Sequence, residues 1–367
     1  MYQVFKKEKI MRPTVMEVDL SALKNNISEI KKYIGNKEIM PIIKANAYGT
    51  HINKIISIFD EFNIVGVATI KEGVKLRKLG FTKEIFILNQ PSISELNEIV
   101  EYNLTIGISS FAFLREVIKR NIKIKVHLEL ETGMNRTGIN LLKIDDFIKN
   151  ITENIKVEGI YTHLSSADID EEYTKEQLDK FDQGVKQIQK KLPNVKYIHS
   201  LASSGILKKL SDKTNLVRPG IILYGYYPSN NIERKINIKP ICKLKTKIIF
   251  LKEVSENSSI SYSRKYVTNK KTKVATIPIG YADGLKRVLS NKGYVIINNK
   301  KCNIIGNICM DSCMIDVTEI DNVKVDDDVY IWDNDLITVE EIATLCDTIN
   351  YEIISTISNR VERVFIE

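Results

Sequence analysis

The sequence predicts an α/β protein with a (β/α)8 TIM barrel over residues 12–238 and a mostly-β C-terminal domain over residues 239–367. Two observations support this prediction. A strand–helix rhythm runs through the first two thirds of the chain, and short alternating strands replace it after Lys239. A chain of 367 residues is long enough for two domains, one of which can be a barrel. Residues 1–11 are expected to pack with the second domain.

The first two thirds of the chain alternate β-branched runs with amphipathic stretches. Apolar residues recur at helical spacing from Leu23 to Ile34 and from Ile52 to Ile56, and a further helix is expected over Lys175–Lys191. About eight such units in roughly 230 residues favour a closed parallel barrel over an open sheet. No G-x-G-x-x-G follows the first strand, which disfavours a dinucleotide-binding fold. The expected strands are Thr14–Val18, Ile39–Ile43, Ile64–Ala68, Glu84–Leu88, Leu104–Ile108, Ile124–Leu128, Val157–Tyr161, Tyr197–His199 and Leu216–Val217.

The last third of the chain has the pattern of an antiparallel β domain. Leu244, Thr246 and Ile248 alternate with lysines, as expected for a strand with one face in solvent. Turn residues such as Asn291-Lys-Gly293 separate the later strands, and one helix is expected near Val339–Cys346. The further expected strands are Val274–Pro278, Tyr294–Ile297, Cys302–Ile305, Cys313–Val317 and Asp328–Trp332.

Composition and charge exclude several classes of protein. The formal net charge of +8 comes from lysines scattered beside acidic residues, so no nucleic-acid partner is expected. No apolar run approaches the length of about 18 residues that a membrane helix needs, and no secretory signal is evident, so a cytoplasmic location is expected. The odd number of cysteines argues against a disulfide framework. Cys309 and Cys313 lack a second pair, so buried thiols and no metal site are expected.

The chemically unusual residues fall where the expected barrel strands end, which is where active sites of such barrels lie. Each alone has an ordinary explanation, such as a solvated lysine, a structural ion pair or a histidine bonded to a backbone carbonyl. Their convergence on one face favours a site instead. They are Lys44 with Tyr48 and Gly49, Glu129 with Arg136, His163, Ser203 with Ser204 and Gly205, and Arg218 with Pro219 and Gly220.

These residue types suit a carbonyl compound that carries a phosphate. Lys44 at the end of an apolar strand is partly desolvated, which lowers its pKa and makes the neutral amine available as a nucleophile. Ser203, Gly205 and Gly220 offer hydroxyl and backbone N–H groups for a phosphate. A phosphorylated carbonyl compound held by a lysine indicates pyridoxal phosphate, and a nearby arginine suits a substrate carboxylate.

Ordered motifs along essentially the whole chain resemble those of bacterial alanine racemases. Lys44-Ala-Asn-Ala-Tyr-Gly49 resembles their cofactor-lysine signature. A lysine motif alone is weak evidence, whereas ordered matches in both domains are specific. The other matches are Glu131-Thr-Gly-Met-Asn-Arg-Thr-Gly138, Tyr161-Thr-His163, Val217-Arg-Pro-Gly-Ile-Ile-Leu-Tyr-Gly225, Ser261-Tyr262, Pro278-Ile-Gly-Tyr-Ala-Asp-Gly284 and Cys309-Met-Asp311.

The resemblance implies a pyridoxal-phosphate enzyme that interconverts L- and D-alanine and supplies D-alanine for peptidoglycan. It further implies a head-to-tail homodimer in which the β domain of one subunit completes the active site of the other. Lys44 would carry the cofactor and act as one base, and Tyr262 from the partner chain would act as the other. Two bases on opposite faces allow a proton to leave one face while another arrives on the other.

The resemblance also implies supporting roles. His163 and Arg218 would form a polar chain toward Tyr262, and Arg218 would face the pyridine nitrogen, which a permanent cation keeps unprotonated. Cofactor contacts are implied for Tyr48, His163, Ser203, Arg218, Gly220, Ile221 and Tyr351. Substrate contacts or entrance positions are implied for Arg136, Met310 and Tyr281, and orienting roles for Glu129 and Asp311.

Some positions depart from the family pattern. Glu129 stands where the family often has a carbamylated lysine, and its carboxylate would orient Arg136 directly. Ala202 replaces a commonly polar residue, which leaves open whether Ser203 or Ser204 meets the phosphate. Changes near the substrate pocket, such as Asn307 and Ser263, keep a serine or broad-specificity amino-acid racemase as the alternative, because pockets discriminate small additions weakly.

Two other functions fit parts of the pattern. A pyridoxal-phosphate decarboxylase has a related fold, and Cys309-Met-Asp311 superficially resembles its cysteine–aspartate pair, although the sequence around Tyr262 favours a racemase. A non-catalytic cofactor carrier is the alternative outside the enzymes, but such barrel-only proteins lack a β domain that donates a second base.

Overall fold

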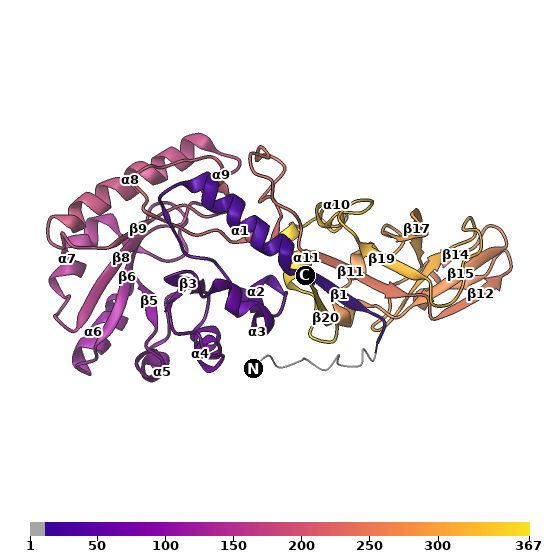
Figure 1. Ribbon diagram of the computed structural model, residues 1–367, viewed down its shortest axis with the longest axis horizontal. Coiled ribbons are helices and arrows are strands. Elements are labelled where there is room, and N and C mark those ends of the chain that lie inside the picture. The colour runs from indigo at the N-terminus through magenta and orange to yellow at the C-terminus, as the bar shows by residue number, and fades with distance from the viewer. Residues whose placement is uncertain (1–11) are drawn as a thin grey trace. The chain divides into compact units, whose positions relative to one another are not determined.

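The computed structural model describes residues 12–367, which form two compact units. Ala22–Lys239 form the barrel unit, and residues 12–21 with Pro240–Glu367 form the β unit (Figure 1). The expected packing of residues 1–11 lies outside the described residues. In residues 12–367, no helix is long and apolar enough to cross a membrane.

The barrel unit is a ring of parallel strands, which confirms the predicted α/β barrel (Figure 1). Strands β3 to β9 pair side by side, and β10 pairs with β2 so that Val217 lies opposite Ile39. Single bridges from Ile42 to Gly66 and from Ala202 to Arg218 close the ring. The ring strands are β2 (Glu38–Ile39), β3 (Ile64–Val67), β4 (Glu84–Ile87), β5 (Thr105–Ile108), β6 (Ile124–Glu131), β8 (Ile155–Tyr161), β9 (Tyr197–His199) and β10 (Leu216–Val217); the short β7 (Ile139–Asn140) pairs with β6.

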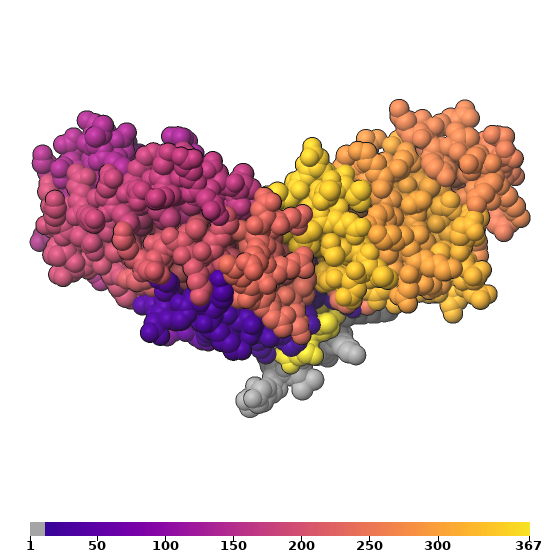
Figure 2. Space-filling model, turned by 90° about the horizontal axis from the view of Figure 1, so that it is seen from above, coloured from indigo at the N-terminus to yellow at the C-terminus, as the bar shows by residue number. Residues whose placement is uncertain are grey.

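Helices alternate with the ring strands along the chain, and the purple to pink residues of the barrel unit fill one side of the space-filling view (Figure 2). Helix α8 begins at Glu171 rather than at the expected Lys175, because the Asp170 carboxylate accepts a hydrogen bond of 2.9 Å from the Tyr173 N–H and caps the helix. The barrel-unit helices are α1 (Leu20–Ile34), α2 (Lys44–Tyr48), α3 (Ile52–Ile55), α4 (Ile70–Lys78), α5 (Leu96–Glu101), α6 (Phe111–Lys119), α7 (Ile144–Lys149), α8 (Glu171–Gln189) and α9 (Ser203–Leu207), with short 3-10 turns that include η2 (Ile93–Glu95) and η4 (Ile221–Tyr224).

The expected strand at Thr14–Val18 does not belong to the barrel, and assigning it there is wrong. It forms β1 (Val15–Asp19), which pairs antiparallel with β11 (Cys242–Lys247) and parallel with β20 (Glu362–Ile366) in the sheet of the β unit. Glu17 on β1 also forms an ion pair of 2.5 Å with Lys245 on β11. A strand followed directly by a helix fits either sheet locally, and the partners that decide its place lie far away in sequence.

The β unit is mostly β, as predicted, and its strands form one nine-stranded sheet with a separate two-stranded hairpin (Figure 1). Helix α11, strand β20 and a small hairpin of β13 and β14 were not among the expected elements. The strand order in the sheet is β12-β15-β18-β17-β16-β19-β11-β1-β20. Its later strands are β11 (Cys242–Lys247), β12 (Phe250–Val254), β15 (Thr272–Ile277), β16 (Tyr294–Ile297), β17 (Lys300–Ile305), β18 (Cys313–Asp316), β19 (Asp328–Trp332) and β20 (Glu362–Ile366). The remaining elements are β13 (Ser259–Ile260), β14 (Tyr266–Val267), α10 (Val339–Leu345), α11 (Asn350–Ser355) and three 3-10 turns, η5 (Tyr262–Arg264), η6 (Tyr281–Asp283) and η7 (Arg287–Leu289).

All five cysteines are free thiols. Cys313 is buried on β18, as expected, whereas Cys309 is only partly buried because it lies in the turn that precedes this strand.

The N-terminal end of the barrel buries a pair of carboxyl groups. Glu84 begins β4, and the carboxyl group of Glu158 on β8 lies nearby. One oxygen on each of Glu84, Glu158 and Thr105 is buried without a hydrogen-bond partner of normal geometry. Burial raises the pKa of Glu84, and the charge of Glu158 acts in the same direction.

We expect Glu84→Gln to stabilise the protein at high pH. A raised folded-state pKa means that protonated Glu84 is favoured in the fold, so its contribution to stability is lost as the pH rises through that value. The neutral amide should raise the free energy of unfolding by about 1 kcal/mol at pH 8 and by less at pH 5. Urea unfolding at both pH values measures this, with Glu98→Gln on exposed α5 surface as the control. An equal effect at the two pH values would contradict it.

Candidate active site

Lys44 follows a short barrel strand that is held on both sides. The Met40 and Ile42 N–H groups donate to Val217 O and Pro219 O at 2.8 and 2.9 Å, and the Ile43 N–H donates to Gly66 O at 2.9 Å. These bonds fix the backbone at the point where the side chain of Lys44 leaves the barrel.

The turn after Lys44 is left-handed. Ala45, Asn46, Ala47 and Tyr48 have φ values of 52°, 55°, 56° and 54°. This conformation costs about 1–2 kcal/mol per residue for L-amino acids. Strain of this kind gathers at functional sites, where the surrounding structure holds it in place.

The surroundings of Lys44 favour its neutral amine. Its surface remains exposed, yet the protein packed around its ammonium group lowers its pKa. The charges of Arg136 and Arg218 also lower this pKa, whereas Glu72 opposes them. The direction agrees with the expectation from the sequence.

Arg218 is a buried cation whose terminal nitrogens are fully used. It is 2% exposed and donates to the carbonyl oxygens of His199 at 2.6 Å and Thr162 at 2.7 Å, and to His199 Nδ1 at 2.8 Å. A longer bond of 3.3 Å reaches Ser200 O. Burial lowers its pKa to about 10, so it stays charged at neutral pH. Within residues 12–367, its Nε–H donates no hydrogen bond, which leaves one donor for a ligand.

Three neutral histidines surround this cation. Burial, followed by the charge of Arg218, lowers the pKa values of His127 and His163 to about 3 and that of His199 well below its usual value. Because arginine only donates, His199 Nδ1 must accept, so His199 Nε2–H donates to His127 Nδ1 at 2.8 Å. His163 Nδ1 lies 3.5 Å from Arg218 Nη2. His127 and His199 are not among the predicted site residues, although a histidine on an apolar strand is a signal that could have found them.

The groups expected to form a phosphate site lie together. Ser203 is buried, and its Oγ accepts a hydrogen bond of 3.1 Å from the Gly220 N–H. Tyr48 stacks on Tyr224 with ring centroids 4.5 Å apart. A Cβ added at Gly220 would lie 2.5 Å from the phenol oxygen of Tyr48, so a larger residue here would displace that ring. Ile221 follows at the start of η4, and Ser203 rather than Ser204 is the serine bonded to Gly220.

Glu129 and Arg136 occupy the end of β6 and the loop beyond it. Glu129 is 4% exposed, its Oε2 has no hydrogen-bond partner, and burial raises its pKa although Thr137 and Arg136 oppose the shift. Arg136 is exposed, and among the described residues no ion pair joins it to Glu129. Tyr161, which is not among the predicted site residues, lies close to Glu129. Its phenol donates to Leu88 O at 3.0 Å. The orphaned oxygen of Glu129 therefore has an unused capacity to accept a hydrogen bond.

Tyr262 lies at the tip of the β13–β14 hairpin in the β unit. Its side chain is 71% exposed and begins η5, next to Ser261 with φ 64°. Asn307 fixes this tip, since its Nδ2 donates to Tyr262 O at 2.8 Å and its O accepts from Ser261 Oγ at 2.6 Å. Asn307, at which this chain differs from the family pattern, therefore holds the backbone of Tyr262 in place.

Tyr281 and Met310 belong to two adjoining segments of the β unit. The Tyr281 N–H donates to Cys309 O at 3.1 Å, and the Ala282 N–H donates to Met310 O at 3.0 Å. Both side chains are exposed, at 42% for Tyr281 and 52% for Met310. Tyr351 lies on α11 of the same unit.

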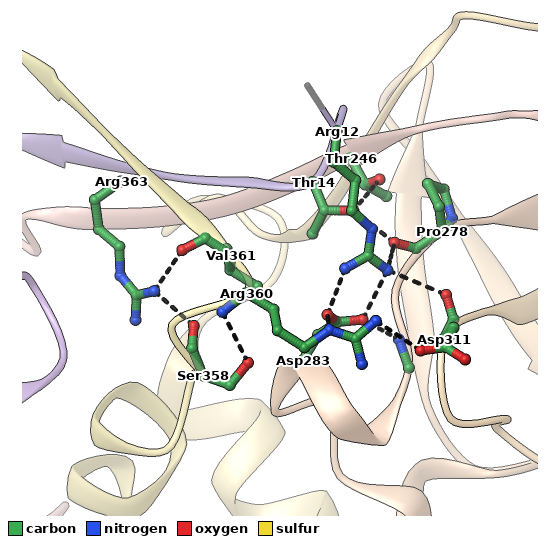
Figure 3. A network of polar contacts seen from close by, with 11 residues as sticks. Arg12, Thr14, Thr246, Pro278, Asp283, Asp311, Ser358, Arg360, Val361 and Arg363 are labelled. Atoms are coloured by element: carbon green, nitrogen blue, oxygen red, sulfur yellow. Dashed lines mark hydrogen bonds and ion pairs between the residues drawn. The ribbon is translucent and has the colours of Figure 1, made fainter. Parts of the chain in front are cut away.

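A buried carboxylate and two arginines hold these segments (Figure 3). Asp283 is fully buried and accepts from Arg12 Nη1 at 2.5 Å and from the Gly280 N–H at 2.9 Å. The Nε atom of Arg360 lies 3.5 Å from Asp283 Oδ1, and its Nη2 donates to Asp311 Oδ1 at 2.6 Å. Of these groups only Asp311 is a predicted site residue, because the ion pairs join segments that are distant in sequence.

The predicted site residues thus form two groups. The barrel unit brings together Lys44, Tyr48, Glu129, Arg136, His163, Ser203, Arg218, Gly220 and Ile221 at the C-terminal ends of its strands, and the β unit carries Tyr262, Tyr281, Met310, Asp311 and Tyr351.

Both units match family models and full-length relatives. The models "Alanine racemase, N-terminal domain" and "Alanine racemase, C-terminal domain" match residues 18–228 and 241–365. The chain is 40% identical to an alanine racemase of Halothermothrix orenii over 98% of each protein. It is 38% identical to an alanine racemase of Methanococcus maripaludis, over 97% of this chain and 100% of that protein.

Solved structures agree with these matches. Alanine racemase of Clostridium difficile 630 superposes with a TM-score of 0.92 at 32% identity, covering 98% of this chain and 97% of that one. The Bacillus anthracis enzyme with bound L-Ala-P gives 0.92 at 31% identity, covering 98% and 96%. The Bartonella henselae enzyme with covalently bound pyridoxal phosphate gives 0.87 at 26% identity, covering 96% and 99%. With both domains matched and relatives aligned over nearly its whole length, this chain belongs to the alanine racemase family.

Proposed function

We propose that this protein interconverts L- and D-alanine with pyridoxal phosphate as its cofactor and so supplies D-alanine for peptidoglycan. The observation that carries the proposal is the barrel mouth, where Lys44 lies within electrostatic reach of the buried cation Arg218. The Nε–H donor that Arg218 leaves unused suits the ring nitrogen of this cofactor.

The residues present fit the cofactor. The neutral amine of Lys44 suits attachment to its aldehyde carbon, and Ser203, Gly220, Ile221 and Tyr48 would hold its phosphate. Tyr351 is the further phosphate contact that the family pattern implies. When bound, pyridoxal phosphate supplies a conjugated ring that accepts the electron pair left by removal of the α-proton. Arg218 offers only donors and a permanent charge, so it would keep the ring nitrogen unprotonated and favour return of the proton over side reactions.

Two bases would act on opposite faces of the substrate. Lys44 serves one face, and the partner's Tyr262 serves the other in a head-to-tail homodimer. The high exposure of Tyr262 at a hairpin tip that Asn307 holds by a hydrogen bond supports its use by another chain. His163 would link Arg218 to that phenol, since its ring lies 3.5 Å from Arg218 and is neutral.

The remaining predicted residues would bind and position the substrate. Arg136 and the backbone of Met310 would bind its carboxylate, with Tyr281 at the entrance. Glu129 would orient Arg136, and Asp311 would hold the Met310 segment through its bond to Arg360. Serine is the alternative substrate, and incubation with each amino acid separates the two.

We expect the purified protein to bind pyridoxal phosphate, to absorb visible light and to invert L-alanine. Lys44→Ala should lower turnover about a thousandfold or more, because it removes both the attachment point and one base. Lys71→Ala on the exposed face of α4 is the control. Chiral chromatography after separate incubation with L-alanine and L-serine measures the product. A protein that binds the cofactor and inverts neither amino acid would contradict the proposal.

We expect Tyr262→Phe to lower turnover by about 10²–10⁴-fold, because the phenol proton is lost while the ring remains. Tyr266→Phe on the same hairpin should leave the rate unchanged. Mixing Lys44→Ala and Tyr262→Phe subunits should restore roughly a quarter of the wild-type activity, since half of the dimers then hold one intact site. Failure of the mixture to recover activity would argue against shared sites.

We expect Glu129→Gln to raise the KM for alanine about tenfold with a smaller effect on kcat, because an amide no longer attracts Arg136. Glu84→Gln, at the other end of the barrel, is the buried-carboxyl control. Unchanged turnover and substrate affinity in Glu129→Gln would rule out the orienting role.

A further inference from the structure

The left-handed turn after Lys44 is held by side chains from α4. The Ala45 N–H donates to Glu72 Oε1 at 2.6 Å, and Lys75 Nζ donates to Asn46 Oδ1 at 3.1 Å. Asn46 Oδ1 also accepts from the Ile52 N–H at 3.2 Å, which ties the turn to the helix that follows it. These bonds reach the first two residues of the strained run, where a relaxation would directly move Lys44.

Glu72 holds the turn while it also caps its own helix. Its Oε2 accepts from the N–H groups of Ala68 and Thr69 at 2.9 and 3.2 Å, and its N–H donates to Thr69 Oγ1 at 3.3 Å. This capping box fixes the carboxylate at the start of α4, directly after β3. One carboxylate therefore connects the end of a barrel strand to the turn that presents Lys44.

A second capping box in the same barrel shows what is unusual about Glu72. Glu95 accepts from the Ser92 N–H at 2.8 Å in the same manner, and both glutamates are partly buried. Among residues 12–367, Glu95 makes no bond to another segment through its second oxygen. The bond to Ala45 is thus additional to the needs of a helix cap.

We propose that Glu72 and Lys75 are positioning residues for Lys44, because they hold the left-handed turn Ala45–Tyr48 and with it the direction of the lysine side chain. This proposal rests on the proposed role of Lys44 as the cofactor lysine. It adds two residues on α4 that act through the backbone without touching the substrate.

The test compares Glu72→Ala with Glu95→Ala in the cofactor-loaded protein. Both changes remove a capping carboxylate, so both should lower the melting temperature to a similar extent. Hydrogen exchange followed by mass spectrometry should show backbone amides of residues 45–51 exchanging at least about tenfold faster in Glu72→Ala and unchanged in Glu95→Ala. Release of pyridoxal phosphate into a large volume of buffer should accelerate by about tenfold in Glu72→Ala alone.

Lys75→Met provides a second arm that removes one bond and retains the aliphatic stem. It should accelerate exchange in the same segment about threefold without affecting α4. Equal exchange in Glu72→Ala and Glu95→Ala would overturn the proposal, as would faster exchange with unchanged cofactor release. If Glu72→Ala does not fold, unchanged exchange in Lys75→Met overturns it. The exchange measurement tests the turn and does not depend on activity. If the proposed function is wrong, the wild-type protein will be inactive while the exchange of residues 45–51 still responds to Glu72→Ala.

Discussion

Arg218 is a permanent cation inside a barrel, and a buried ion costs several kcal/mol unless its donors find acceptors. The structure meets this constraint with carbonyl oxygens at the ends of β8 and β9 and with the ring of His199. Burial lowers the pKa values of the nearby His199 and His163, and the charge of Arg218 lowers them further, so these histidines are neutral. The positions of the strand ends, the tautomers of two histidines and the polarity of the barrel mouth therefore all depend on this one side chain.

The β unit buries a charge of the opposite sign, the carboxylate of Asp283. Asp283 has no exposed surface, and two arginines from opposite ends of the chain neutralise it. Removing one partner from a buried pair leaves an uncompensated charge, which is more costly than loss of a surface ion pair. The exposed Tyr281 and Met310 side chains are thereby carried on a backbone that is fixed beneath them.

The repeating pattern of apolar residues was sufficient to predict the barrel, because strand and helix periods are local properties of the chain. The position of Val15–Asp19 was not predictable in this way, since its partners β11 and β20 are specified by distant residues. The same distinction applies to the site. Lys44, Arg218 and Gly220 lie in recognisable motifs, whereas Glu72 looks like an ordinary helix cap and its bond to Ala45 follows only from the tertiary fold. His127 and His199 could have been suspected as polar residues on buried strands, but their shared hydrogen bond could not.

The place of β1 between β11 and β20 also bears on how the protein is made. Ribosomes synthesise β1 before both of its partners, so each edge of β1 stays unpaired until β11 or β20 has been made, and the edge that faces β20 stays open longest. The barrel residues emerge in the interval and can fold as a unit with this strand still open. An open edge is a template for pairing with other chains, and β1 carries the buried apolar residues Val15, Met16 and Val18. Chains interrupted before Glu362 would retain that open edge permanently, which makes completion of the last strand a protection against aggregation.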